Sequence, residues 1–201
     1  MVFFMALNSE RKFVGLTGTF ASGKGTVIEV ARELYGDRVA SVSTSDIVRE
    51  ETARRGLSLE RENLQRVANE LRAEKGTSVL AEMALERASE LPEKVKIVFV
   101  DGIRNVGEVN FLRRLGRNFV LWAVDAPLEL RYERVKQRKR AKENLLSFEE
   151  FKESDARERA GMISSAQMVG ACMDLADEKI VNDGSRDQLK ERVAFLLKAF
   201  I

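Results

Sequence analysis

The residues with the most specific chemistry in this 201-residue sequence lie in the stretch 18–26, which reads GTFASGKGT. Gly18 and Gly23 permit backbone angles that a side chain would forbid, so successive N–H groups can turn inward onto phosphate oxygens. Lys24 can reach the terminal phosphates of a nucleotide as a mobile point charge. The spacing therefore predicts a phosphate-binding loop (P-loop).

The flanking sequence supplies the strand and the helix that such a loop requires. An apolar run at 13–16 precedes it, and Val27, Val30, Ala31 and Leu34 then fall on one face of a helix. The first turn of that helix adds unpaired N–H groups and the positive end of its dipole. A glycine turn that precedes a helix by chance is the alternative, and it leaves the lysine and the full spacing unexplained.

One position of the loop departs from the general pattern. The residue after the lysine usually has a hydroxyl that binds Mg²⁺, but here it is Gly25, and Thr26 follows one residue later. A metal would then depend on phosphates, water and a distant carboxylate, with Thr26 as a candidate ligand. The residues expected to bind ATP in the loop are Gly18, Ala21, Ser22, Gly23, Lys24, Gly25 and Thr26.

A second chemical element is the carboxylate that ends a buried strand. The run 95–100 is almost wholly apolar and is followed by Asp101 and Gly102. An aspartate in this position beside a P-loop can hold Mg²⁺ directly or through water. The alternative is a turn aspartate helped by Gly102. We predict that Asp101 anchors the metal.

Two arginines complete the candidate site. Arg49 and Arg104 lie just beyond two strands that we expect to flank the P-loop strand, so they could converge on one anion. The planar guanidinium suits this role because it binds two phosphate oxygens at once. A surface arginine more often pairs with a neighbouring carboxylate, and Glu50 or Glu51 could serve Arg49 in that way.

Composition limits the remaining functions. The length fits one domain with a proper core, and 44% hydrophobic with 33% charged residues is typical of a soluble globular protein. The net charge of +2 gives no global case for nucleic-acid binding. The absence of histidine excludes histidine-based triads and metal sites, and the lone Cys172, expected in the core, suits a reducing cytoplasm. The apolar residues 1–7 are too few for a signal peptide or a membrane span.

Short apolar strands alternate with helices along the whole chain. This order predicts an α/β fold of three layers, with helices on both faces of a parallel sheet and ligands at the carboxyl ends of the strands. We expect strands at 13–16, 39–43, 95–100, 119–124 and 179–181. We expect helices from the P-loop to about 35–37, from a Thr44 or Ser45 cap to about 56, and at 60–75, 79–92, 106–115, 127–140 and about 186–200, with polar helix within 141–173.

The densest charge run is basic and follows the fourth strand. Such a run is usually a solvated helix face, but after this strand it can also fold over a triphosphate as a lid, since phosphoryl transfer needs cations around the moving group. With 148–151, Asp155, Arg157 and Arg159 it would form a lid at about 136–165. Its basic residues are Arg131, Arg134, Lys136, Arg138, Lys139, Arg140 and Lys142.

Several stretches carry a family resemblance. STSDIVR at 43–49 is similar to the adenylate-kinase segment that holds the monophosphate acceptor, and DGIR at 101–104 looks like the DGFPR turn of that family without its proline. Together with 46–51, 63–65, 69–72, 148–151 and 180–184, they resemble an archaeal nucleotide-kinase-related group within the P-loop nucleoside monophosphate kinase superfamily, which is also similar to dephospho-coenzyme A kinase.

This resemblance implies one P-loop kinase-like domain over 1–201, with a five-stranded parallel sheet, a helical acceptor-binding insert at about 44–91 and the lid. By the resemblance, Thr44 and Arg49 contact the acceptor, Arg104 its phosphate, and Arg138 the phosphates of ATP. Residues 182–185, which include Gly184, lie beside the donor adenine. The missing proline changes where Arg104 points, and no paired aspartates follow Arg140.

The leading hypothesis is a cytoplasmic, ATP- and Mg²⁺-dependent phosphotransferase that acts on a small acceptor, a nucleoside monophosphate. Lys24, Asp101, Arg104 and Arg138 are its expected catalytic residues. A hydroxyl acceptor such as dephospho-coenzyme A would need a carboxylate base, and Asp46 is the candidate. The alternative from another class is a nucleotide-sensing ATPase that uses the basic run for a macromolecular partner.

Overall fold

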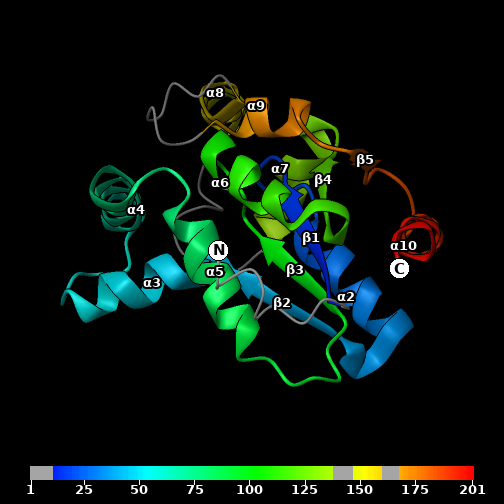
Figure 1. The fold of residues 1–201 in the computed structure, drawn as a ribbon. Helices are drawn as coiled ribbons and strands as arrows, with labels where there is room; N and C mark the ends of the chain where they lie inside the picture. The colour runs from blue at the N-terminus through cyan, green and yellow to red at the C-terminus, as the bar shows by residue number, and fades with distance from the viewer. Residues whose placement is uncertain (1–10, 138–146, 160–167) are drawn as a thin grey trace.

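A computed structural model describes residues 11–137, 147–159 and 168–201, and within them the chain forms one parallel sheet of five strands in the order β2-β3-β1-β4-β5 (Figure 1). The expected α/β/α architecture is confirmed. The strands are β1 Lys12–Thr17, β2 Val39–Ser43, β3 Ile97–Asp101, β4 Phe119–Asp125 and β5 Glu178–Val181.

The helices cover both faces of this sheet because its three inner strands, β1, β3 and β4, are apolar on both sides. α2 (Lys24–Tyr35) and α10 (Arg186–Phe200) bury one face, together with Val14 and Leu16 of β1. α5 (Val79–Ser89), α6 (Val106–Leu112) and α9 (Val169–Asp174) bury the other (Figure 1). The lone Cys172 of α9 is fully buried in this second core, as expected.

The strand order corrects one prediction. β2 pairs with β3 and not with β1, so the strand before Arg49 does not flank the P-loop strand. β3 takes the inner position because it is apolar throughout, whereas β2 carries serines that suit a sheet edge. Arg49 and Arg104 nevertheless follow two neighbouring strands.

Between β2 and β3 the chain forms the helices α3 (Thr44–Arg54), α4 (Arg61–Lys75) and α5. Helices thus occupy the stretch predicted to be the acceptor-binding insert, and that role stays a prediction, but the predicted cap of α3 was wrong by one residue. The hydroxyl of Ser43, not that of Thr44 or Ser45, accepts the Asp46 N–H at 3.2 Å. α5 ends before Pro92, which has no N–H to donate to the Ala88 carbonyl. The buried Arg11 side chain donates to this carbonyl and to those of Leu91, Pro92 and Val95 instead.

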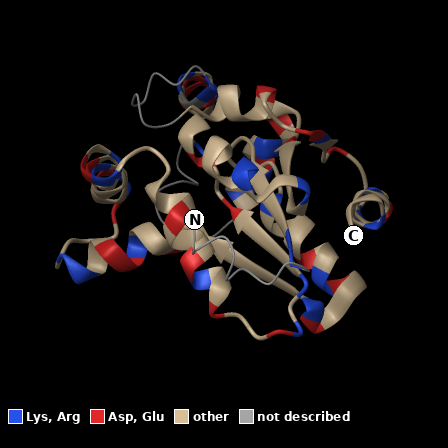
Figure 2. Cartoon of the chain, viewed as in Figure 1, with Lys and Arg blue, Asp and Glu red and all other residues tan. Residues whose placement is uncertain are grey.

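After β4 come α7 (Leu128–Gln137) and α8 (Phe148–Arg159), and two short 3₁₀ helices, η1 (Gly36–Arg38) and η2 (Arg113–Asn118), precede β2 and β4. The middle of the expected lid, with Arg138, lies outside the described residues. Basic and acidic residues are interspersed over the helices (Figure 2). In the described part of the chain no helix is long and apolar enough to cross a membrane.

Candidate functional site

The loop between β1 and α2 has the backbone that its glycines require. Gly18 and Gly23 both have positive φ, 137° and 101°, and Gly23 forms the left-handed N-cap of α2. A Cβ on Gly18 would lie 2.0 Å from the carbonyl oxygen of Val124. Ala21 also has a positive φ, 60°, which is strained for a residue with a side chain and is typical of a functional loop.

Lys24 folds back over this loop. Its ammonium donates to the carbonyl oxygens of Gly18 at 2.9 Å and Thr19 at 3.0 Å. These carbonyls hold the positive charge at the mouth of the loop, where the phosphates of a nucleotide would offer stronger, anionic acceptors.

Asp101 lies at the carboxyl end of β3 and is half-buried, with its Oδ1 shielded from solvent. Burial raises the pKa of its carboxyl above the ordinary value, although the nearby charges of Lys24 and Arg104 favour the ionised form. Its Oδ1 has no hydrogen-bond partner, and neither do the buried hydroxyls of Thr17 and Ser22. Three unsatisfied buried oxygens around one loop fit a bound group with its own polar atoms.

The donor set also fits a metal shared with a nucleotide. No cluster of three or more metal-ligating side chains occurs in the ranges that the structure describes, so Asp101 would need phosphates and water to complete a coordination shell. Thr26 lies in the first turn of α2 and is partly exposed. Its role as a ligand stays a prediction.

The Thr44 hydroxyl, predicted to contact the acceptor, lies against the turn after β3. It donates to the carbonyl oxygens of Asp101 at 3.2 Å and Gly102 at 2.9 Å. A Cβ on Gly102, whose φ is +91°, would lie 2.7 Å from this hydroxyl oxygen. Thr44 therefore ties the insert to the Asp101 turn, which spacing alone does not show.

The two arginines have different partners. Arg49 donates to Asp46 at 2.8 Å in an exposed pair, whereas the expected alternatives, Glu50 and Glu51, pair with other arginines. The Arg104 side chain forms no ion pair with any described residue, and its charge lies near enough to stabilise ionised Asp101. Asp46 also raises the Asp101 pKa, so it lies on the same side of the site.

Asn182, expected beside the donor adenine, and Arg134 of the basic run hold the end of the P-loop, a contact that the sequence did not predict. The Asn182 side chain donates to the Ser22 carbonyl at 2.9 Å, and Arg134 donates to Ser22 at 3.2 Å and to the Asn182 carbonyl at 2.8 Å. A Cβ on Gly23 would lie 2.0 Å from the Asn182 amide nitrogen. Asn182 directly follows β5, and this place at the carboxyl end of a strand is the sequence signal that could have indicated its contact with the loop. Gly184 comes two residues later, just before Ser185, which caps α10.

Arg131 joins α7, α8 and the P-loop. Only 1% of its surface is exposed, and its guanidinium makes a two-pronged pair with Asp155 of α8, one contact being 2.8 Å. It also donates to the carbonyls of Ala126 at 2.9 Å and Phe20 at 3.4 Å. A residue in the basic run is therefore a buried structural group, not part of a solvated face.

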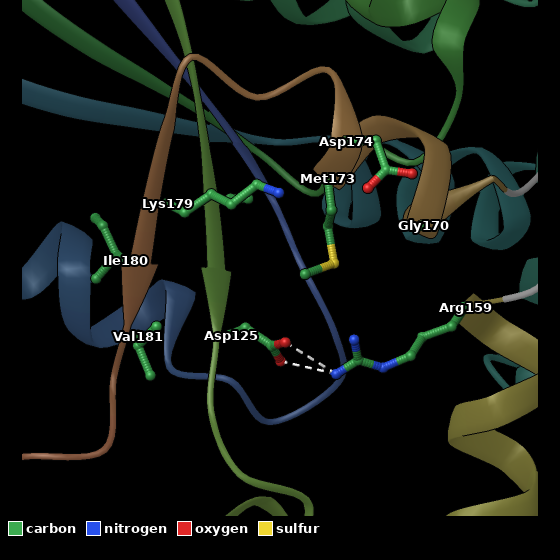
Figure 3. Close-up of a pocket in the computed structure, with 9 residues that line it drawn as sticks. Asp125, Arg159, Gly170, Met173, Asp174, Lys179, Ile180 and Val181 are labelled. Carbon is green, nitrogen blue, oxygen red and sulfur yellow. Dashed lines mark hydrogen bonds and ion pairs between the residues drawn. The ribbon is translucent and has the colours of Figure 1, made fainter.

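Asp125, at the end of β4, is the third carboxylate of this edge. It accepts the Thr19 hydroxyl at 2.8 Å and Arg159 of α8 at 3.0 Å on each oxygen. Burial alone would raise the pKa of Asp125, but these hydrogen bonds outweigh it and the pKa is lowered. The pair forms one end of a cavity of about 290 Å³, which extends to Met173 and Lys179 (Figure 3).

The sequence is similar to known archaeal proteins. The family described as AAA domain matches residues 17–151. A UPF0200/UPF0201 protein of Archaeoglobus fulgidus is 42% identical over 94% of this chain, which spans only 55% of that relative's length. A UPF0200 protein of Thermococcus onnurineus is 36% identical over 92% of this chain and 96% of its own length.

Solved structures share the fold at low identity. TT1252 from Thermus thermophilus superposes with a TM-score of 0.61 at 24% identity, over 96% of this chain and 99% of its own. The shikimate kinase from Bacteroides thetaiotaomicron has a TM-score of 0.54 at 19% identity, over 94% and 97%. The expected P-loop kinase-like fold and the archaeal resemblance are confirmed.

Proposed function

This chain belongs to the AAA domain family and to the UPF0200 family, and from that premise we propose that it is an ATP- and Mg²⁺-dependent phosphotransferase whose acceptor is a nucleoside monophosphate. A kinase-like P-loop fold is consistent with nucleotide-dependent phosphotransfer in general. One observation supports the proposal most: Lys24, Asp101 and Arg104 lie close together at one edge of the sheet. The Oδ1 of Asp101 has no hydrogen-bond partner, and the Arg104 side chain has no ion-pair partner among the described residues.

The proposed roles follow from charge. Lys24 and the loop amides hold the β- and γ-phosphates, and Asp101 holds the magnesium ion, whose chemistry is to neutralise charge on those phosphates. Arg104 and Arg49 bind the acceptor phosphate, for which Arg49 exchanges its exposed partner Asp46. An acceptor phosphate is already anionic, so this reaction needs no general base. Arg138 would add a cation from the lid, and Gly184 would lie near the adenine.

One observation favours a hydroxyl acceptor, such as dephospho-coenzyme A, as the second candidate. Asp46 lies in the first turn of α3, directly after β2, whose Ser43 pairs with Asp101 in the sheet, and its carboxylate is exposed on that side of the site. A carboxylate there could take the proton from an attacking hydroxyl. Asp46→Asn would then abolish turnover with a hydroxyl acceptor, whereas turnover with a phosphate acceptor would persist.

The test is ATP consumption with Mg²⁺ against each ribo- and deoxynucleoside monophosphate, dephospho-coenzyme A, and no acceptor. Stimulation by one monophosphate supports the proposal and identifies the substrate. Stimulation by dephospho-coenzyme A alone replaces it with the second candidate. Hydrolysis that no acceptor stimulates contradicts both and points to a nucleotide-sensing ATPase with a macromolecular partner. Lys24→Ala must abolish every genuine signal.

A further inference from the structure

A buried ion pair connects the insert to the turn that carries Arg104. Arg72 of α4 donates to Oε1 of Glu108 of α6 at 2.8 Å, and the two side chains are 4% and 0% exposed. A second, longer bond from the Arg72 Nε to the same oxygen is 3.3 Å. Such a pair is rarely a net source of stability, because both charges lose their hydration. Its presence therefore calls for a role other than stability.

The second oxygen of the same carboxylate holds the Arg104 backbone. Glu108 Oε2 accepts the N–H of Arg104 at 2.8 Å and that of Asn105 at 3.2 Å. The carbonyl of Arg104 in turn accepts the N–H of Met168, the residue before α9, at 2.6 Å. The Arg104 peptide is thus held from both sides, while its guanidinium makes no ion pair within the described residues.

Helix capping alone does not require a charge at this position. Glu108 is the N3 residue of the capping box of α6, and in α10 an uncharged residue, Gln188, does the same work at 2.8 Å from the Ser185 N–H. A glutamine would cap α6 without burying a charge. The carboxylate differs from it because it accepts on both oxygens, whereas the NH2 of a glutamine that caps α6 would face the donors of Arg72.

We propose that Glu108 and Arg72 are positioning residues for Arg104. Through this ion pair, the position of α4 determines how the acceptor-binding Arg104 is oriented. This inference rests on the proposed function and extends it. α4 otherwise packs against α3 and α5 through apolar contacts and a partly exposed ion pair between Glu70 and Arg55, whereas the buried pair connects it to the Arg104 turn. Binding of an anionic acceptor by Arg104 then favours the position of α4 seen here, and this position of α4 in turn favours acceptor binding.

Amide hydrogen exchange tests the positioning without reference to activity. In Arg72→Met the carboxylate loses its partner, and the Arg104 and Asn105 amides should exchange about tenfold faster, while amides of 27–31 in α2 keep their rates. Arg66→Met is the matched control, because Arg66 lies on the same helix but is 54% exposed. Equal acceleration at all amides, or none, would overturn the inference.

Kinetics test the link to the acceptor, with AMP and every other acceptor that the wild type uses. Glu108→Gln combined with Arg72→Met keeps an uncharged cap and removes both buried charges, so stability should return to near that of the wild type. The acceptor KM should still rise about tenfold with the ATP KM unchanged, since Arg104 is no longer held by α4. A wild-type acceptor KM in this stable double variant would refute the inference. No acceptor-stimulated turnover in the wild type would refute the proposed function instead, and the exchange rates would still decide the positioning.

Discussion

At the scale of single residues, the candidate site depends on groups whose state is unfavourable in the free protein. Asp101 is a half-buried residue whose carboxyl has one shielded, unsatisfied oxygen and a raised pKa. Such a group destabilises the folded state at neutral pH, where the carboxyl is ionised. A bound cation would compensate this charge. Its neighbour Lys24 donates to two backbone carbonyls of the loop, where the phosphates of a nucleotide would be stronger acceptors.

Asp101→Asn should therefore stabilise the nucleotide-free protein while it weakens Mg²⁺ binding. Because the folded pKa of Asp101 is raised, its contribution to stability is largest in acid and is lost as the pH rises through that pKa. The variant should thus unfold at a higher temperature than the wild type near pH 7, and the difference should shrink towards about pH 4. Calorimetry at both pH values measures this, and a less stable variant near pH 7 would contradict the assignment.

At the scale of elements, ion pairs connect the helices that surround the site. Glu51 pairs with Arg54 of its own helix, α3, and with Arg55, the residue that caps the end of α3. Arg55 also pairs with Glu70 of α4 at 2.6 Å. On the other side, Arg131 joins α7 and α8 behind the P-loop. The first network is partly exposed and the second is buried, so we expect different consequences when each is broken.

Breaking the buried pair should release α8. Arg131→Met removes the two-pronged partner of the buried Asp155 and leaves this carboxylate only its contact with the partly exposed Arg159 at 3.1 Å. Breaking a buried pair typically destabilises by about 3–5 kcal/mol, and the remaining contact puts the expected loss at the lower end of that range. We expect faster proteolysis within 147–159 and a lower unfolding temperature, whereas Arg157→Met on the exposed side of the same helix changes neither. Arg131→Met combined with Asp155→Leu should recover much of the loss. An intact α8 in the single variant would show that the pair is not what holds it.

The partly exposed network should show itself in its pH dependence. Arg54 and Arg55 lower the pKa of Glu51 to about 2. The stabilisation that this carboxylate provides is therefore present in full above the ordinary pKa of a glutamate and is lost as the pH falls from there through about 2. Glu51→Gln should therefore destabilise α3 near neutral pH and have little effect at about pH 2. Exchange rates of the α3 amides report the difference, and a pH-independent effect would argue against the charge as its cause.

At the scale of the whole molecule, two cores on opposite faces of one sheet meet at the P-loop edge. β1 leads into the loop, β3 ends in Asp101, β4 in Asp125 and β5 precedes Asn182. Ligand binding at this edge contacts elements from both cores. We therefore expect nucleotide binding to stabilise the molecule as one cooperative unit and not only the loop.

Mg²⁺–ATP at about 100 times its dissociation constant should stabilise the folded state by about 2.7 kcal/mol, or about 5–10 °C in a chain of this size. Lys24→Ala and Asp101→Asn should lose most of this shift, because each removes a charge that faces the phosphates or the metal. Lys94→Ala is the control, since Lys94 pairs with Asp37 on the exposed surface. An equal shift in all variants would place the nucleotide elsewhere.

The sequence by itself determined the alternation of elements and the P-loop, because hydrophobic periodicity and glycine geometry are local properties. All five expected strands occur within a few residues of their places, and Asp101 stands at the end of its strand as expected. A local signal cannot give sheet order, however, and the position of β2 beyond β3 was decided only by which strand could be buried on both faces.

The partners of charged side chains were likewise decided by tertiary structure. Arg131 is in the basic run, yet packing placed it against Asp155, 24 residues further along the chain; Glu108 met Arg72 from another helix. Electrostatic and hydrogen-bond energies depend on distances across the fold, which spacing along the chain does not encode. The sequence thus determined which phosphate-binding chemistry is available, and the fold decided which charges support it and which remain to meet a ligand.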